Sequence, residues 1–262
     1  MAKKIYINPG HSNVDPGAVG YETERKLNVK VSEYMNDYLL ANYECETKMT
    51  DYNNNSLRAV SSEANEWKAD LFVSNHFNAG GGDGYEALVV SEARKPIGQI
   101  FEKHVKAIGQ NSRGVKIRPE LHVLKATNMP AVLNEGAFVD NKKDIEDWND
   151  NSELKKMGQA YAKAAAEYLN LPKKKASSGS GSASKTPEKT TTETKTEAFK
   201  PYVVRVTASA LNVRKGPGTN YEVATVIRDK GSYTIVEEAG DGFWGKLKSG
   251  AGWISLRHTT KI

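Results

Sequence analysis

Residues 1–171 alternate between two patterns of hydrophobic positions. Short apolar runs bounded by turn residues predict buried strands, and longer segments with apolar residues three or four positions apart predict helices. The expected strands cover residues 3–10, 43–50, 69–78, 86–92, 120–127 and 130–138. The expected helices cover residues 24–42, 56–68, 96–109 and 152–171. Two helix starts carry the usual signals, because Ser56 is a candidate N-cap and Pro96 stands in a first turn.

This alternation predicts an α/β fold. It indicates an open, mostly parallel sheet with helices on both faces. In such sheets the functional site lies beyond the carboxyl ends of the strands. The residues that end the expected strands are therefore the first place to look for chemistry.

The hydrophobic pattern stops after residue 171. Residues 172–201 consist almost entirely of Lys, Ser, Thr, Gly, Glu and Pro, and such a segment buries too little apolar surface to offset its conformational entropy. We predict a flexible linker there, because structureless loops of this length are uncommon inside compact domains. In residues 202–262, short strands separated by glycine-rich turns predict a small all-β barrel.

Composition narrows the class of protein only a little. Charged residues make up 26% of the chain and hydrophobic residues 38%, which is ordinary for soluble globular domains. No stretch approaches the roughly 18 consecutive apolar residues of a membrane span, so we expect no membrane insertion. The net charge of +5 suits nucleic acid or an anionic cell-wall polymer equally well.

The single cysteine, Cys45, excludes an internal disulfide. Residues 1–7 begin with basic residues but lack the long apolar core of a signal peptide.

Four residues place chemistry at the predicted sheet edge. His11 follows the first expected strand after a Pro-Gly turn, His76 stands near the end of a buried strand, and Glu135 follows the apolar run AVLN. Glu24 begins the first expected helix. Two imidazoles and one carboxylate form a zinc site that needs only water in its fourth position. A further carboxylate, Glu135, then acts on that water as a general base or stabilises the transition state.

Taken singly, each of these residues also has a structural interpretation. A histidine in a glycine-rich turn, such as His11, is usually a solvated surface residue, and His76 is a fair candidate for a satisfied core histidine. Glu24 suits the positive end of a helix dipole. Glu135 is harder to dismiss, because a carboxylate after a buried apolar run is costly unless it is paired or functional. The convergence of all four at one edge favours a functional site.

Four motifs of the first domain resemble a known family. The segments NPGH, ERKLN, SNHFNA and PAVLNEGAFVDN occur in family order over residues 4–171 and resemble the zinc-dependent N-acetylmuramoyl-L-alanine amidases of bacterial autolysins and phage endolysins. The resemblance implies that His11, Glu24 and His76 are zinc ligands and that Glu135 is the catalytic carboxylate. It also implies hydrolysis of the amide that joins N-acetylmuramic acid to the L-alanine of the stem peptide.

The sequence departs from the family pattern at two positions. Asn8 stands where family members often carry Asp, and Asn134 stands where an apolar residue is common. Neither departure removes a ligand. Glu22 is a rival to Glu24, and we prefer Glu24 because it stands three positions before Leu27-Asn28, as the ligand does in the family.

Two further residues are candidates for contact with the substrate. They are Asn78, at the start of a glycine-rich loop over residues 78–87, and Arg118. The loop is not a phosphate-binding loop, because no Gly-Lys-Ser/Thr follows it. The three other histidines are interpreted as structural, with His104 in a helix, His122 in a strand and His258 near the C-terminus.

The second domain carries its own resemblance. The segments ALNVRKGPGTNYEVATVI and FWGKL, followed by GWISL, are similar to bacterial SH3-like domains of cell-wall hydrolases. The resemblance implies binding to peptidoglycan peptides, with Asn212, Arg214, Tyr221 and Trp244 as candidate contacts. Trp253, between Gly and Ile, is expected in the core.

We therefore predict a peptidoglycan hydrolase with one zinc ion and peptidoglycan, not nucleic acid, as its partner. A phage endolysin held in the host cytoplasm until the membrane is permeabilised, and then acting on the wall, fits the missing signal peptide. A bacterial autolysin with the same activity and a stem-peptide endopeptidase on the same scaffold are alternatives. A non-catalytic wall-binding protein is a third, which the complete set of four residues argues against.

Overall fold

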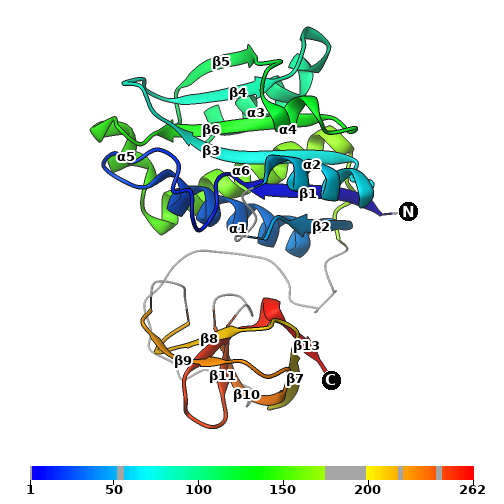
Figure 1. Ribbon diagram of the computed structural model, residues 1–262, viewed down its shortest axis with the longest axis vertical. Helices are drawn as coiled ribbons and strands as arrows, with labels where there is room; N and C mark the ends of the chain where they lie inside the picture. Colours follow the sequence, from blue (N-terminus) through cyan, green and yellow to red (C-terminus); the bar gives the residue numbers. More distant parts are fainter. Residues whose placement is uncertain (1, 52–55, 175–198, 218–220, 240–243) are drawn as a thin grey trace, which may run out of the picture. The chain divides into compact units, whose positions relative to one another are not determined.

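The computed structural model describes residues 2–51, 56–174, 199–217, 221–239 and 244–262. They belong to two compact units, within residues 1–180 and 181–262 (Figure 1). Most of the predicted linker, residues 175–198, lies outside the described residues, so its limits at 172 and 201 stay predictions. No helix in the described parts of the chain is both long and apolar enough to cross a membrane.

The first unit is built on a six-stranded sheet in the order β2-β1-β3-β6-β4-β5. Four neighbouring pairs are parallel, and only β4 and β6 run antiparallel. The predicted open, mostly parallel sheet is confirmed. The strands are β1 (Lys3–Pro9), β2 (Cys45–Met49), β3 (Leu71–Asn78), β4 (Tyr85–Val89), β5 (Ser112–Ile117) and β6 (Ala131–Phe138).

Helices cover both faces of this sheet (Figure 1). One face packs against α1 (Glu24–Asn42), α3 (Lys95–Lys106) and α6 (Asn151–Leu169). The other face packs against the shorter α2 (Leu57–Glu66) and α4 (His122–Lys125). The remaining helices are the 3-10 turn η1 (Glu92–Arg94) and α5 (Lys142–Trp148).

The hydrophobic spacing of the first helix explains its packing. Leu27, Val31, Met35 and Leu39 lie on one side of α1 and are fully buried, and each such side chain stabilises the fold by roughly 1.5–3 kcal/mol. The predicted start signals hold elsewhere, because the Ser56 side chain accepts a hydrogen bond from the backbone of α2 and a proline stands in the first turn of α3.

Three local predictions differ from the structure. Residues 120–127 were expected to form a strand, but His122–Lys125 form the short helix α4. The adjacent residues Val123 and Leu124 both pack into the cluster beneath the sheet, which a strand with alternating side chains does not allow. His122 bonds to Ser61 of α2 over 3.2 Å. The strand β5 and the helix α5 were not predicted at all, because β5 is polar and half-exposed and α5 is short.

The second unit is an antiparallel sheet in the order β13-β7-β10-β11-β12-β8-β9. Its small core contains Val204, Val213, Ile235 and Ile254. This confirms the all-β class predicted for it. The elements are β7 (Tyr202–Val206), β8 (Leu211–Arg214), β9 (Val223–Ile227), β10 (Ser232–Ala239), β11 (Trp244–Leu247), β12 (Trp253–Ser255), the 3-10 turn η2 (Leu256–His258) and β13 (Thr259–Lys261).

Candidate active site

The turn after β1 brings His11 to the carboxyl edge of the sheet. β1 ends at Pro9 and the chain turns at Gly10. His11 then adopts a left-handed backbone conformation, with φ of 67°, which is uncommon for residues other than glycine. Such strain costs roughly 1–3 kcal/mol and concentrates at functional sites, where the surrounding structure maintains it.

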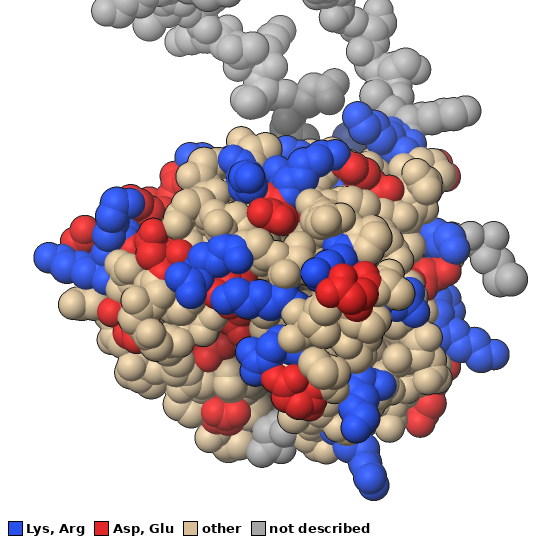
Figure 2. Space-filling model, turned by 90° about the horizontal axis from the view of Figure 1, so that it is seen from above, with Lys and Arg blue, Asp and Glu red and all other residues tan. Residues whose placement is uncertain are grey.

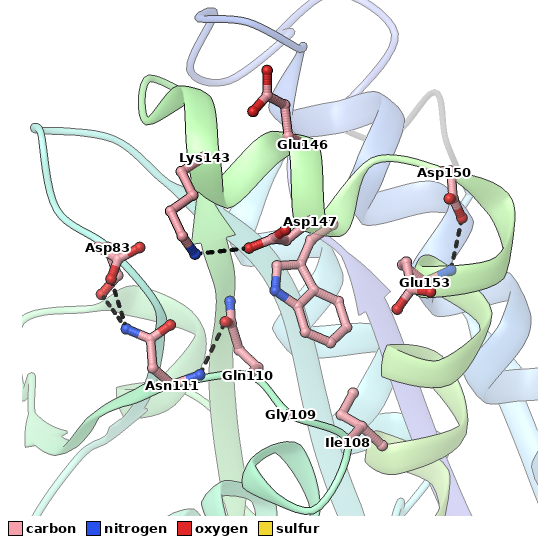
Figure 3. Close-up of a pocket in the computed structure, with 11 residues that line it drawn as sticks. Asp83, Ile108, Gly109, Gln110, Asn111, Lys143, Glu146, Asp147, Asp150 and Glu153 are labelled. Atoms are coloured by element: carbon pink, nitrogen blue, oxygen red, sulfur yellow. Dashed lines mark hydrogen bonds and ion pairs between the residues drawn. The ribbon is translucent and has the colours of Figure 1, made fainter.

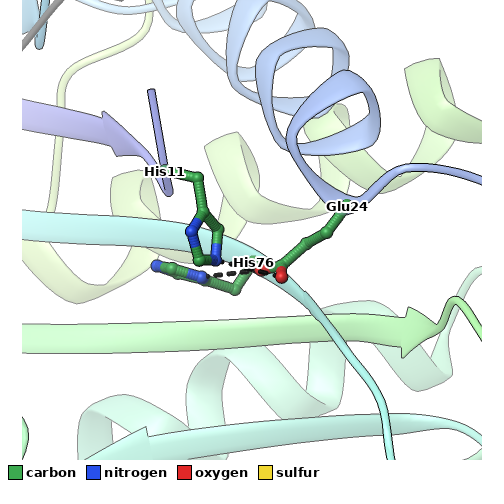
Figure 4. Close-up of side chains that lie close together, drawn as sticks. All are labelled: His11, Glu24 and His76. Carbon is green, nitrogen blue, oxygen red and sulfur yellow. Dashed lines mark hydrogen bonds and ion pairs between the residues drawn. The ribbon is translucent and has the colours of Figure 1, made fainter. Parts of the chain in front are cut away.

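Glu24 and His76 reach the same point from α1 and β3. Glu24 is the first residue of α1, and His76 lies in the second half of β3. Nε2 of His11 lies 3.0 Å from Oε2 of Glu24, and Nδ1 of His76 lies 2.9 Å from Oε1 of Glu24 (Figure 4). One donor atom from each residue lies within 4.8 Å of the other two. Two imidazoles and a carboxylate so arranged form a candidate metal site.

Two glycines leave the space that these side chains fill. A Cβ atom on Gly10 would lie 2.1 Å from Cε1 of His76. A Cβ atom on Gly17 would lie 2.5 Å from Oε2 of Glu24 and 2.6 Å from Cδ2 of His11. Any larger residue at either position must displace a side chain of the candidate site.

Hydrogen bonds orient the donor atoms. Oδ2 of Asp15 lies 2.9 Å from Nδ1 of His11, which leaves Nε2 of His11 toward Glu24. The backbone N–H of Ala18 donates to Oε2 of Glu24 over 2.9 Å, and Nδ2 of Asn28 donates to Oε1 over 3.3 Å. A carboxylate on the outer nitrogen of a histidine is typical of metal centres, where it holds the ring in place.

The hydrogen bonds among these residues shift the pKa values of His11 and Glu24. The hydrogen bond to Glu24, reinforced by one to Asp15, outweighs burial and raises the pKa of His11 to about 9. Burial raises the pKa of Glu24, but hydrogen bonds from His11 and His76 outweigh it and hold that pKa well below its usual range. The cluster therefore binds a proton tightly at a place where a metal ion competes for the same atoms.

Glu135 lies beside this cluster on the next strand. The backbone register pairs His76 with Glu135, and Glu135 with Glu86 of β4, so the three side chains share one face of the sheet. Oε2 of Glu135 is buried and has no hydrogen-bond partner among the described residues. Burial, together with the charges of Glu24 and Glu86, raises the pKa of Glu135 well above its usual range. A carboxyl group in this state is suited to proton transfer.

The structure also gives the partners of the other predicted residues, Glu22, Asn78 and Arg118. Glu22 pairs with Lys26, so the structure brings Glu24, not Glu22, to the two histidines. Nδ2 of Asn78 donates to Glu86 over 3.3 Å. Arg118 pairs with a neighbouring acid and is close enough to lower the pKa of Glu135 against the effect of burial.

The two departures from the family pattern have structural explanations. Asn8 is buried, donates to Ser74 over 2.8 Å and accepts from Thr50 over 2.9 Å. Asn134 is buried on the opposite face of β6, where it accepts from the Tyr85 hydroxyl over 2.7 Å. Both amides are satisfied within the core, so neither alters the candidate site.

Two residues at the site were not singled out from the sequence. Asp15 is close to His11 in the chain, and that proximity was the only available signal. Glu86 is only 5% exposed and opens the apolar run EALVV. An acid beside a buried run is the same signal that drew attention to Glu135, and it applied equally to Glu86.

A pocket of about 690 Å³ is lined by other residues, including the segment 108–111 and the helix α5 (Figure 3). Its polar groups are bonded to one another, because Asn111 donates to Asp83 over 2.8 Å and Lys143 pairs with Asp147 over 2.9 Å. None of the predicted site residues lines it. The pocket is therefore not a rival to the His/Glu/His cluster.

In the second unit the candidate wall contacts lie at or near the surface. Tyr221 is 43% exposed and Asn212 is exposed, whereas Trp244 is half-buried. Nη1 of Arg214 donates to the backbone carbonyl of Tyr221 over 2.8 Å. Trp253 is buried at 8% exposure, as expected for a core residue.

Comparison with known proteins agrees with both resemblances. Residues 5–167 match the family model described as N-acetylmuramoyl-L-alanine amidase, and residues 209–260 match the bacterial SH3 domain. The chain is 32% identical to the sporulation-specific N-acetylmuramoyl-L-alanine amidase of Bacillus subtilis (strain 168), over 67% of the chain and 71% of that protein. It is 34% identical to the endolysin of Bacillus phage SPP1, over 68% of the chain and 70% of that protein.

A solved structure supports the same grouping. The catalytic domain of CwlV, an N-acetylmuramoyl-L-alanine amidase from Bacillus (Paenibacillus) polymyxa var. colistinus, is 28% identical in sequence and has a TM-score of 0.61. The match covers 65% of this chain and 99% of that domain. The similarity therefore extends to the arrangement of the strands and helices that carry the candidate site.

Proposed function

The chain belongs to the N-acetylmuramoyl-L-alanine amidase family, and we propose that it hydrolyses the amide between N-acetylmuramic acid and L-alanine in bacterial peptidoglycan. In this proposal His11, Glu24 and His76 hold a zinc ion, and Glu135 is the catalytic carboxylate. The observation that carries the proposal is the convergence of three donor atoms within 4.8 Å of one another, beside a buried carboxyl oxygen.

The residues present fit a zinc ion. Catalytic zinc sites commonly use three protein ligands from histidine nitrogens and a carboxylate oxygen, and they keep one position open. The carboxylate of Asp15 behind His11 and the cramped glycines at 10 and 17 are features of a site built around these side chains. When bound, the ion polarises the scissile carbonyl and lowers the pKa of a water at the site to about 7.

Glu135 moves the proton. In the described residues its Oε2 is committed to no other group, so it accepts a proton from the attacking water. The water oxygen forms a bond to the carbonyl carbon, the bond from that carbon to the amide nitrogen breaks, and Glu135 returns the proton to the departing amine. The products are the free carboxyl group of the muramic acid and an amino group on alanine.

We also assign roles to the rest of the chain. Residues 1–171 are the catalytic domain, residues 172–201 are a flexible linker, and residues 202–262 bind the cell wall through Asn212, Arg214, Tyr221 and Trp244. A flexible tether raises the local concentration of the enzyme at an insoluble polymer without adding catalytic contacts. We place the action of the protein at the wall, after the membrane has been permeabilised.

Digestion of purified peptidoglycan tests the reaction. New alanine amino termini with unchanged glycan reducing ends are expected, and they should disappear with a chelator and return with zinc. New amino termini on other residues would indicate a stem-peptide endopeptidase, and no release would leave a binding protein. Glu135→Ala is expected to retain zinc and lose turnover, whereas Glu146→Ala, at an exposed carboxylate of α5, is the matched control and should keep both.

A further inference from the structure

A row of ionisable side chains continues from the candidate metal centre across the sheet. The strands β3, β6, β4 and β5 are neighbours in that order, and the register places His76, Glu135 and Glu86 side by side. Neighbouring strands lie about 4.8 Å apart. The strand β5 is therefore about 10 Å from the strand that carries Glu135.

A β-bulge determines which side chains of β5 lie on the same face of the sheet as this row. The register shifts so that Arg113 and Gly114 both lie opposite Glu86, and Gly114 has φ of 85°. With the extra residue, Arg113 and Lys116 both reach the Glu86 carboxylate although they are three positions apart. Bulges beside functional sites re-aim side chains in this way.

Glu86 holds these two cations in place. Its Oε1 accepts from Nε of Arg113 over 2.5 Å and from Nζ of Lys116, and its Oε2 accepts from Asn78 over 3.3 Å. Burial raises the pKa of Glu86, but the hydrogen bonds from Lys116 and Arg113 outweigh it and lower that pKa. Glu86 is therefore ionised, and it is too buried and too fully bonded to be a second proton donor.

Arg113 and Lys116 each have N–H donors that Glu86 does not use. Two positive groups on one carboxylate leave a net charge of +1, and the side chains of Arg113 and Lys116 are 43% and 41% exposed. An arginine has five N–H donors and a lysine three, and the contacts with Glu86 use one of each. Figure 2, which looks onto the β5 side of the unit, shows Lys and Arg side chains spread over this face, at its centre and around its rim, with Asp and Glu among them.

On this basis we propose that Arg113 and Lys116 bind a carboxylate of the peptide substrate, on the leaving-group side of the scissile amide, and that Glu86 and Asn78 position them. The inference rests on the proposed amidase function and adds a specificity site to it. An extended peptide advances about 3.3–3.6 Å per residue, so a carboxylate one residue beyond the alanine lies about 7 Å from the scissile amide. That length fits within the row of about 10 Å.

The chemistry favours a carboxylate over a neutral group. Arginine pairs with carboxylates through two parallel hydrogen bonds, and such charge-assisted bonds are roughly twice as strong as neutral ones. Glu86 fixes the direction of the guanidinium and ammonium groups before the substrate arrives, which reduces the entropy cost of binding. A carboxamide in the same place offers one acceptor and no charge.

Two synthetic substrates test the proposal with zinc-loaded protein. One is muramoyl-alanyl-glutamic acid, and the other is the same compound with its α-carboxylate converted to a carboxamide. The kcat/KM of the wild type is expected to be about 10- to 100-fold higher for the acid, mainly through KM. The double variant R113Q/K116Q is expected to lose this preference, and Glu86→Gln is expected to weaken it. The control R94Q/K106Q removes the same two residue types from η1 and α3 and should keep it.

The outcomes separate this proposal from the proposed function. Equal cleavage of both compounds by the wild type would overturn the specificity site and leave the amidase function intact. Cleavage of neither compound would overturn both. A preference that persists in R113Q/K116Q would also overturn the specificity site. Because the preference is a ratio measured on one preparation, partial unfolding of a variant does not change it, and Lys116→Arg should retain it.

Discussion

Replacing Gly17 by alanine is expected to disable the metal centre without unfolding the protein. The new Cβ would lie 2.5 Å from Oε2 of Glu24 and 2.6 Å from Cδ2 of His11. To reach an ordinary contact of 3.4 Å, the Glu24 oxygen must retreat from 2.5 Å by about 0.9 Å. Metal–ligand distances tolerate about 0.2 Å, so Glu24 can no longer act as a ligand in its present place.

The structure supplies a control for the backbone cost. Gly17 has φ of 68° and Gly81 has φ of 73°, and an alanine at either position pays roughly 1–2 kcal/mol for the left-handed conformation. A Cβ on Gly81 meets nothing within 4 Å. The two variants should therefore lose similar folding stability from backbone strain. Gly17→Ala alone should lose zinc affinity, by more than the roughly 10- to 100-fold typical of changes behind a ligand.

Competition against a chelating dye measures the zinc affinity, and urea unfolding in excess EDTA measures the stability of the metal-free protein. Retained wild-type zinc affinity in Gly17→Ala would refute the reasoning, because it would mean that Glu24 is not a ligand or that the site yields freely. An equal loss of affinity in Gly81→Ala would also refute it, since that variant carries only the backbone strain.

Further predictions concern charge, binding and stability. Folding raises the pKa of Glu135, so the metal-free protein loses stability as the pH rises from about 4.3 through the folded-state pKa. Glu135→Gln lacks this loss, so the unfolding free energy of the variant minus that of the wild type should grow with pH in urea titrations with EDTA. A difference that stays constant with pH would contradict this prediction. Folding raises the pKa of His11 to about 9, so protonated His11 stabilises the folded protein. This contribution to the unfolding free energy is complete below about pH 6.5 and is lost as the pH rises to 9. Zinc binding at pH 7.5 should then release protons, and calorimetric heats that do not vary with the ionisation enthalpy of the buffer would count against this. Asn212→Ala and Tyr221→Ala in the full chain should reduce sedimentation with cell walls while sparing cleavage of a soluble muramoyl peptide, and unchanged sedimentation would remove both residues from the wall contact. Ser56→Ala should destabilise the first unit by about 1 kcal/mol through loss of the α2 cap, a change visible as a lower urea midpoint.

The residues of the candidate site were predictable because they converge at one sheet edge, although each of them alone also has a structural interpretation. His11 follows a Pro-Gly turn at a strand end, Glu24 marks a helix start, and Glu135 interrupts an apolar run. Sheet topology then brings such positions to one edge whatever the details of packing. The choice of Glu24 over Glu22 rested on the family pattern instead, and the structure places Glu24 beside the two histidines while Glu22 pairs with Lys26.

The specificity residues were not predictable for a physical reason. The face on which a strand residue lies depends on the register, and a single extra residue reverses it. The bulge at Arg113 and Gly114 appears as a register shift in the pairing of β4 with β5, and the sequence does not show that pairing. The helix α4 was missed for a similar reason, since its two buried residues pack against α2, which is distant in the sequence.

The bulge in β5 allows substrate preference to change without a change in the hydrolytic chemistry. Inserting or deleting one residue at Gly114 shifts the alternation of the strand by one step, so a different set of side chains meets the incoming peptide. The three candidate ligands and Glu135 lie on other elements and are untouched by that shift. A one-residue change in length at the edge of the sheet is therefore a route to new substrate preference that keeps the hydrolytic chemistry, and it is a more economical route than rebuilding a loop.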